Sequence, residues 1–91
     1  MLKTLYKIIE DRKEKPVEGS YTNSLLNEGY ERIALKVGEE SVELIIAAGK
    51  QGHQRTIEES SDLLYHLFVL LVQQGISLSE IEAELEKRHK Q

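Results

Sequence analysis

The sequence contains no cysteine, no tryptophan and a single proline. Without cysteine, a disulfide scaffold, a zinc ribbon and a thiol nucleophile are excluded. Basic residues are also in the minority, since 12 Lys and Arg stand against 16 Asp and Glu and give a net charge of −4. A non-specific nucleic-acid binder is typically basic, so we expect no nucleic acid as a partner. No apolar run approaches the about 18 residues of a membrane-spanning helix, so we expect no membrane partner.

The residues that are present fit one soluble helical domain. The chain of 91 residues is 40% apolar and 31% charged, which is typical of a single globular domain, here residues 1–91. The N-terminus mixes charged and apolar residues, unlike a signal peptide, so we expect a cytoplasmic protein. Apolar residues recur at helical spacing, and no stretch alternates as a strand does. The predicted fold class is all-α, a helical bundle of about four to five helices.

Glycine and proline mark the ends of five segments, predicted as helices at 2–13, in a short stretch between residues 20 and 29, and at about 30–48, 56–74 and 77–89. The short second helix can be capped by Ser20 or Thr22. Gly75 suits the position just after the fourth helix. Ser77 and Glu80 form a capping-box pattern at the start of the fifth.

An acidic residue lies within the apolar stripe of the third predicted helix. On a helical wheel Glu40 falls among apolar positions that include Ile33, Val37 and Leu44, and Glu43 lies at the edge of the stripe. A carboxylate in an apolar stripe is costly unless it is paired or binds a metal. This position is a first indication of a site.

The fourth predicted helix is apolar around most of its circumference. Its one narrow polar stripe contains Glu59, Asp62, His66 and Gln73. A helix of this kind is buried on nearly every side, and a chain of 91 residues has little material to enclose it. We therefore expect an intertwined homodimer or larger homo-oligomer, in which a second copy covers this helix.

Two acidic pairs with the same spacing form a candidate metal site. Glu40 and Glu43 make one i, i+3 pair, Glu59 and Asp62 make the other, and such pairs are neighbours on a helix surface. If the third and fourth helices pack antiparallel across the connection at 49–52, the pairs face each other. Converging carboxylates repel unless a cation is present, and an all-oxygen ligand set suits Mg²⁺, with Mn²⁺ tolerated. Since substrate phosphates usually complete a Mg²⁺ site, the pattern indicates hydrolysis of a phosphate ester or phosphoanhydride.

Two further residues lie close to these pairs. Lys36 is one turn before Glu40 on the same face and is the candidate cation for the substrate. His66, one turn after the second acidic pair, suits either a hydrogen-bonded core histidine or a partner that orients a carboxylate. Two alternatives stay open: the acidic pairs can be a solvated helix face, and Thr56 with Glu59 can form a capping box that competes for the same carboxylate.

The two acidic pairs together match a family signature. Glu40-x-x-Glu43 followed by Glu59-x-x-Asp62 resembles the ExxE…ExxD pattern of the all-α nucleoside-triphosphate pyrophosphohydrolases. Three further blocks are similar to those of the phosphoribosyl-ATP pyrophosphatase family of histidine biosynthesis: GSYT at 19–22, KVGEE at 36–40 and DLLYH at 62–66. The resemblance covers nearly the whole chain.

This resemblance implies a reaction and its metal ligands. The reaction is the Mg²⁺-dependent hydrolysis of the α–β phosphoanhydride of phosphoribosyl-ATP to phosphoribosyl-AMP and pyrophosphate, the second step of histidine biosynthesis. The resemblance also implies an oligomeric, cytoplasmic enzyme. The implied metal ligands are Glu40, Glu43, Glu59 and Asp62, with Glu58 as an alternative to Glu59 in one register.

The resemblance also suggests roles for other residues. It implies a water-orienting or outer carboxylate at Glu39 and a phosphate contact at Lys36. Ser20 and Thr22 are implied substrate contacts or loop-positioning residues, and His66 is grouped with them. Two other functions remain as alternatives: a house-cleaning pyrophosphohydrolase acting on nucleoside or deoxynucleoside triphosphates, and a non-catalytic helical dimerisation module, which would not bind Mg²⁺.

Overall fold

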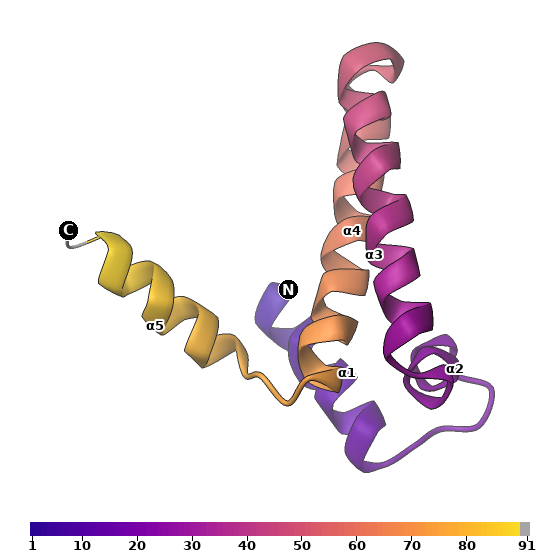
Figure 1. Ribbon diagram of the computed structural model, residues 1–91, viewed down its shortest axis with the longest axis vertical. Helices are drawn as coiled ribbons and strands as arrows, with labels where there is room; N and C mark the ends of the chain where they lie inside the picture. Colours follow the sequence, from indigo (N-terminus) through magenta and orange to yellow (C-terminus); the bar gives the residue numbers. More distant parts are fainter. Residues whose placement is uncertain (90–91) are drawn as a thin grey trace.

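A computed structural model describes residues 1–89 as helices joined by short connections (Figure 1). The elements in chain order are α1 (Leu2–Glu14), α2 (Tyr21–Glu28), α3 (Tyr30–Ile46), the π-helical turn η1 (Ala47–Gln51), α4 (His53–Gln73) and α5 (Leu78–His89). Residues 1–89 include no strand. The predicted all-α class and number of helices are therefore confirmed.

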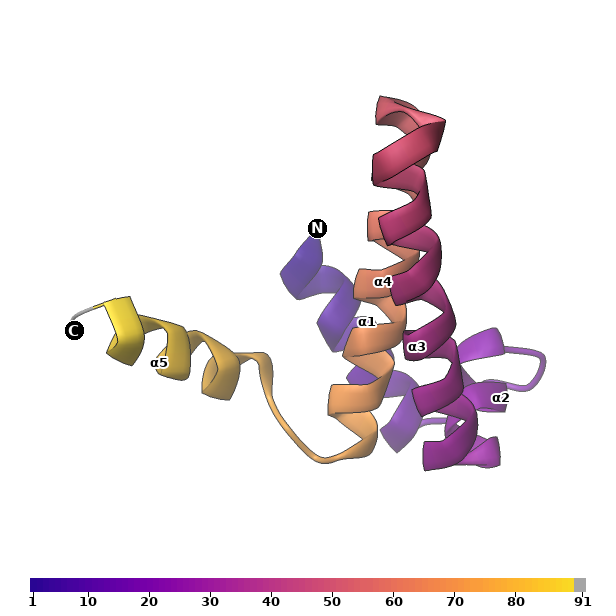
Figure 2. The same ribbon diagram turned by 45° about the horizontal axis from the view of Figure 1, so that its top comes forward.

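Helices α3 and α4 form an antiparallel hairpin, which is the most extensive contact between elements. Figures 1 and 2 show the two helices side by side, with η1 at the tip. The chain reverses at Gly52, whose φ of 90° lies in the left-handed region that other residues rarely adopt. The antiparallel packing expected from the glycine-rich connection is thus present.

The core lies at the other end of the hairpin, where α1 and α2 meet the start of α3 and the end of α4. Its buried residues come from all four helices: Tyr6, Ile9, Leu25, Ile33, Phe68, Val69 and Val72. The ring of Tyr6 packs edge-on against Phe68, with 5.0 Å between centroids. This cluster fixes α2 close to the hairpin.

Helix α2 begins at Ser20, whose hydroxyl accepts the backbone N–H of Asn23 at 3.2 Å. The buried Asn23 side chain donates to the carbonyl of Arg12 at 2.7 Å and accepts the backbone N–H of Val17 at 2.8 Å. It therefore fixes the connection between α1 and α2. Of the two predicted caps, Ser20 is correct and Thr22 is wrong, because Thr22 lies inside the first turn.

Helix α4 begins earlier than expected, at His53 rather than near residue 56, and its N-cap is Gly52. The capping box of Thr56 and Glu59 is therefore wrong. The Thr56 hydroxyl donates to the carbonyl of Gly52 at 2.8 Å, and Glu59 lies in the second turn, where its carboxylate is available for other contacts. The third helix also ends earlier than expected, because the chain widens into η1 after Ile46.

The C-terminal signals are confirmed. After α4, the N–H groups of Gly75 and Ile76 donate to carbonyls of its last turn at 3.0 and 2.9 Å, the pattern of a glycine C-cap. At the start of α5, Glu80 accepts the backbone N–H of Ser77 at 2.7 Å, and the Ser77 hydroxyl accepts the N–H of Glu80 at 3.2 Å. Helix α5 then points away from the hairpin and contains no buried residue (Figures 1 and 2).

Several large apolar side chains stay exposed on the hairpin: Leu35, Val42, Ile45 and Ile46 on α3, and Ile57 and Leu64 on α4. Within one chain, α4 therefore keeps apolar side chains exposed that its composition predicts to be buried. Among residues 1–89, no single helix has the length and apolarity to cross a membrane, although α4 and α5, bent by 106° at their break, pass that test as a pair by length and composition.

Candidate metal centre

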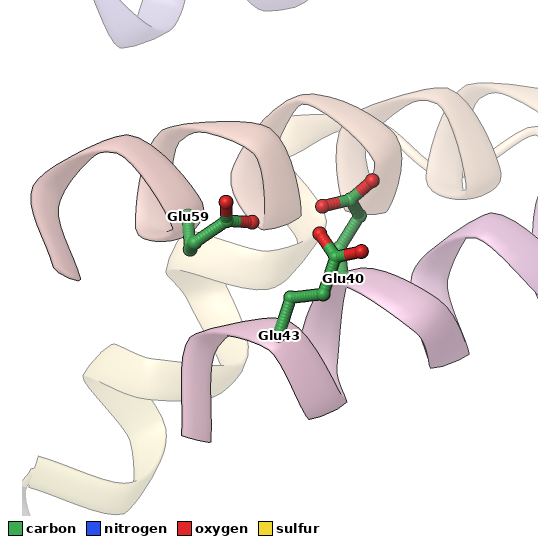
Figure 3. A group of neighbouring side chains, drawn as sticks. All are labelled: Glu40, Glu43 and Glu59. Carbon is green, nitrogen blue, oxygen red and sulfur yellow. The ribbon is translucent and has the colours of Figure 1, made fainter. Parts of the chain in front are cut away.

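Three carboxylates meet between α3 and α4. Glu40 and Glu43 come from α3 and Glu59 from α4, and one oxygen of each lies within 4.8 Å of the others. Figure 3 shows the three side chains in the space between the two helices. The hairpin therefore brings together three of the four predicted ligands.

Two of these carboxylates are buried and only partly satisfied. Glu40 is 6% exposed and Glu59 4% exposed, and Oε2 of each lacks a hydrogen-bond partner. The second oxygen of each is paired, with Lys36 at 3.5 Å for Glu40 and with Arg55 for Glu59. A buried, unpaired carboxylate oxygen is costly. An all-oxygen cluster with two such oxygens fits a hard divalent cation.

The three carboxylates shift one another's pKa values. The neighbouring carboxylates of Glu59 and Glu40 raise the pKa of Glu43. The pKa of Glu59 is lowered, chiefly because Arg55 donates to its carboxylate. Of these two carboxylates, Glu43 is therefore the easier to protonate. A metal ion competes with protons for carboxylate oxygens, so we expect metal binding here to weaken as the pH falls.

Lys36 lies on the α2 side of the cluster. Its ammonium is 3.5 Å from Glu40 and 3.6 Å from Glu39. Burial acts to lower the pKa of Lys36, but nearby Tyr21, Glu39 and Glu40 outweigh burial and raise it. Lys36 is therefore a fixed positive charge next to the carboxylates, as its sequence position suggests. Glu39 is half exposed and lies outside the three-carboxylate cluster.

Arg55 lies on the η1 side of the cluster and was missed by the sequence analysis. Its guanidinium binds Glu58 and Glu59 at once. Its i, i+4 spacing to Glu59 is a signal that was available. Glu58 stays about half exposed and paired with Arg55, which lowers its pKa, and it takes no part in the cluster.

Asp62 lies one turn after Glu59, but its side chain is exposed and is not one of the three clustered carboxylates. Its backbone carbonyl accepts a hydrogen bond from Nδ1 of His66 at 2.8 Å. Because a carbonyl only accepts, Nδ1 carries the hydrogen, and in the neutral ring Nε2 accepts the hydroxyl of Tyr21 at 3.1 Å. His66 is 6% exposed and is held at both nitrogens.

The GSYT block connects α2 to α4. The Thr22 hydroxyl is hydrogen-bonded to the hydroxyl of Tyr65, while Ser20 caps α2. Both hydroxyls therefore have protein partners, which favours a positioning role over a direct substrate contact. Tyr21, between them, stacks on Tyr65 with 6.1 Å between centroids. The sequence analysis did not single out Tyr21, because its partners are distant along the chain.

Comparisons with known proteins show which family this chain resembles. Residues 2–89 match the family described as phosphoribosyl-ATP pyrophosphohydrolase. The chain is 52% identical over 88 residues to a phosphoribosyl-ATP pyrophosphatase of Clostridium botulinum, covering 97% of this chain and 80% of that protein. It is 54% identical to one of Listeria monocytogenes serotype 4b, covering 97% and 84%. A histidine biosynthesis bifunctional protein HisIE of Caldanaerobacter subterraneus is 49% identical over 90 residues, 44% of its length.

Proposed function

This chain belongs to the phosphoribosyl-ATP pyrophosphohydrolase family, and from that premise we propose that it hydrolyses the α–β phosphoanhydride of phosphoribosyl-ATP. The products are phosphoribosyl-AMP and pyrophosphate, and the reaction is a step of histidine biosynthesis. Relatives across most of the chain bear the name of this enzyme, which disfavours both the house-cleaning and the non-catalytic alternatives. The observation that carries the proposal within the molecule is the cluster of three carboxylates with two buried, unpartnered oxygens.

The proposed cofactor is Mg²⁺, with Mn²⁺ tolerated. Glu40, Glu43 and Glu59 would hold it, with Asp62, the next acidic residue along α4, as the fourth ligand. The support is the all-oxygen donor set and the orphaned oxygens of Glu40 and Glu59. A bound Mg²⁺ would neutralise the negative charge of the phosphate oxygens and activate a water molecule for attack.

Three side chains around the cluster have further roles in binding the substrate, placing a ligand and orienting water. Lys36, held next to Glu40, binds and orients the phosphate chain of the substrate. Arg55 keeps the Glu59 carboxylate ionised and correctly placed. Glu39, exposed next to Lys36, orients the attacking water and takes its proton as the bridging P–O bond breaks. No covalent nucleophile is required, because water is the attacking group.

We also propose a homodimer or larger homo-oligomer in the cytoplasm. Leu35, Val42 and Ile46 follow one another at i, i+7 and i+11, so they lie on one face of α3, and each is 47–57% exposed. Ile57 and Leu64 add exposed apolar surface on α4. A contiguous apolar stripe of this kind is typical of a surface that a second helical pair covers.

The experiment is a pyrophosphate-release assay with the purified protein, Mg²⁺ and phosphoribosyl-ATP. ATP, a deoxynucleoside triphosphate and EDTA serve as controls. We expect rapid, EDTA-sensitive release from phosphoribosyl-ATP alone. Release only from the simple triphosphates would transfer the protein to the house-cleaning class. No release from any substrate would contradict an enzymatic function.

A further inference from the structure

The two helices of the hairpin repeat one short pattern at the carboxylate cluster. Residues 36–40 of α3 read KVGEE, and residues 55–59 of α4 read RTIEE. In each stretch a basic residue lies three and four positions before two glutamates, so the three side chains share one helix face. In each, the second glutamate is buried in the cluster and the first is about half exposed. The ion pairs are Lys36 with Glu39 and Glu40, and Arg55 with Glu58 and Glu59.

The two basic residues lie on opposite sides of the cluster. Helices α3 and α4 run antiparallel, with α2 next to one end of the hairpin and η1 at the other (Figure 1). Each basic residue comes about one turn earlier in its own helix than the carboxylates it pairs with, so Lys36 is on the α2 side and Arg55 is on the η1 side. A phosphoanhydride held at the cluster therefore has a cation on each side of its reacting bond.

Arg55 can bind a further anion while it stays paired. Its guanidinium has five N–H groups in a planar fork, and one terminal nitrogen donates to Glu58 and the other to Glu59. These hydrogen bonds raise the pKa of Arg55, so the group stays positive. Because the side chain is 46% exposed, its other N–H groups are accessible to a ligand.

A hollow of about 250 Å³ adjoins Arg55, and we call it the Arg55 hollow. It is lined by Glu43, Ile46, Gln51 and Arg55. Because Glu43 belongs to the carboxylate cluster and Arg55 binds Glu59 of the same cluster, the hollow borders the proposed metal site directly. The exposed amide of Gln51 has no hydrogen-bond partner in the part of the chain that the structure describes, so it is available to a ligand.

The size and position of the Arg55 hollow suit a diphosphate group. Pockets for drug-sized ligands measure about 300–1,000 Å³, so the hollow is too small for the nucleotide to which the α-phosphate is attached. The phosphate of the phosphoribosyl group is separated from the α-phosphate by two riboses and the adenine, too far to reach a hollow that borders the reacting bond. An arginine fork also matches the oxygens of neighbouring phosphates.

We propose that Arg55 and the Arg55 hollow hold the β- and γ-phosphates of the substrate, which leave as pyrophosphate. Lys36 then lies on the α-phosphate side of the reacting bond. Because Glu43 lines the hollow, the diphosphate is accepted only when a cation neutralises this carboxylate. The inference rests on the proposed function, since it gives a direction to the same substrate at the same site.

Pyrophosphate itself is the probe, and titration calorimetry measures its Kd without turnover. Each titration contains enough Mg²⁺ to saturate the variant under study, as established by a separate titration with Mg²⁺ alone. A changed affinity for the metal is therefore not counted as a lost contact to pyrophosphate. With EDTA in place of Mg²⁺, the wild type should bind no pyrophosphate.

Three variants of the hollow should weaken the binding of pyrophosphate. We expect Arg55→Gln to raise its Kd about tenfold or more, as for a lost charge-assisted hydrogen bond. Arg55→Lys, which keeps the charge beside Glu59 but loses the fork, should lie between this variant and the wild type. Gln51→Leu, which leaves every carboxylate contact intact, should raise the Kd about threefold. The Kd of phosphoribosyl-AMP should stay within about twofold in all three.

Arg88→Gln and Gln74→Leu are the matched controls. Arg88 pairs with Glu84 at 3.0 Å on the surface of α5, and Gln74 has an exposed side chain at the end of α4. Neither residue lines the Arg55 hollow, so both variants should bind both products as the wild type does. A thermal melt of each variant verifies the fold.

Lys36→Gln tests the direction of the substrate. It should weaken the binding of pyrophosphate less than Arg55→Gln does, because Lys36 is on the other side of the reacting bond. An equal or larger loss in Lys36→Gln would overturn the inference, and so would an unchanged Kd of pyrophosphate in Arg55→Gln. A wild-type protein that releases no pyrophosphate from phosphoribosyl-ATP would instead overturn the proposed function itself.

Discussion

The two ends of the α3–α4 hairpin are built from the same pair of helices but differ in how completely their facing side chains are satisfied. At the α1–α2 end, Ile33 and Val69 are fully buried among apolar neighbours. Nearer the η1 end, Glu40 and Glu59 are also buried, but each keeps one oxygen without a partner. The first end contributes to stability by itself. The second end is costly to fold without a cation, which is typical of a binding site.

Removing a charge at the η1 end should abolish activity and spare the fold. Glu40→Gln keeps the shape of the side chain but removes a proposed metal ligand and the partner of Lys36. We expect Mg²⁺-dependent release of pyrophosphate to fall about 1,000-fold or more, which corresponds to roughly 4 kcal/mol. Circular dichroism should show unchanged helicity. Glu31→Gln, an exposed glutamate in the first turn of α3, is the control, and near-normal turnover by Glu40→Gln would exclude the ligand assignment.

Asp62→Asn asks whether the acidic end extends beyond the three clustered carboxylates. The exposed Asp62 side chain lies outside the cluster, but we expect a similar loss of turnover because the site needs a fourth ligand in the working enzyme. Its fold should be unaffected, since only its backbone carbonyl makes a hydrogen bond to His66. If Asp62→Asn still releases pyrophosphate and Glu40→Gln does not, the site functions with three carboxylates.

A cavity at the other end should have the opposite effect. Ile33→Ala leaves a void in the core, and we expect the free energy of unfolding to fall by about 2–5 kcal/mol. Denaturant titration measures this loss, and Leu2→Ala, at a position 52% exposed, serves as the control with a change below about 0.5 kcal/mol. Under conditions in which Ile33→Ala is folded, its release of pyrophosphate should still depend on Mg²⁺. If the folded variant lost this dependence, the two ends of the hairpin would not be independent.

Mg²⁺ itself should separate the two ends. A ligand that binds only the native state stabilises it by about 2.7 kcal/mol at 100 times its Kd, so Mg²⁺ should raise the melting temperature of the wild type. The shift should disappear in Glu59→Gln and persist in Ile33→Ala. EDTA should reverse it. An equal shift in Glu59→Gln would show that Mg²⁺ acts elsewhere on the protein.

The sequence predicted correctly those features that depend on residues close together in the chain. The capping box of Ser77 and Glu80 depends only on residues close in the chain, and it was predicted correctly. The approach of the Glu40 pair to Glu59 also followed, because a short connection forces neighbouring helices to pack antiparallel. The capping box depends on residues three positions apart, and the helix packing depends on one short connection.

Other features depend on contacts that no local pattern encodes. The hydrogen bond from Tyr21 to His66 joins residues 45 positions apart, so the role of Tyr21 could not be derived from spacing. The start of α4 was misplaced because Gly52, through its positive φ, caps the helix in place of a polar side chain. The exposure of Asp62 was missed because the wheel gives a residue's direction but not the surface that covers it.

The smallest expected effect lies outside the hairpin, at α5, of which only Leu78 is packed, partly buried, against the core. The N–H and hydroxyl of Ser77 lower the pKa of Glu80 below its ordinary value of 4.5. A group whose folded pKa is lowered contributes stability above its unfolded pKa and loses it as the pH falls through the lowered value. Lowering the pH from 5 toward 3 should therefore fray the start of α5, as amide hydrogen exchange would show. Ser77→Ala should give the same fraying at neutral pH, at a cost of about 1 kcal/mol. Because α5 has no fully buried residue and only Leu78 packs against the core, the hairpin amides next to Ile33 should stay protected in Ser77→Ala. A concerted loss of their protection would contradict the independence of α5.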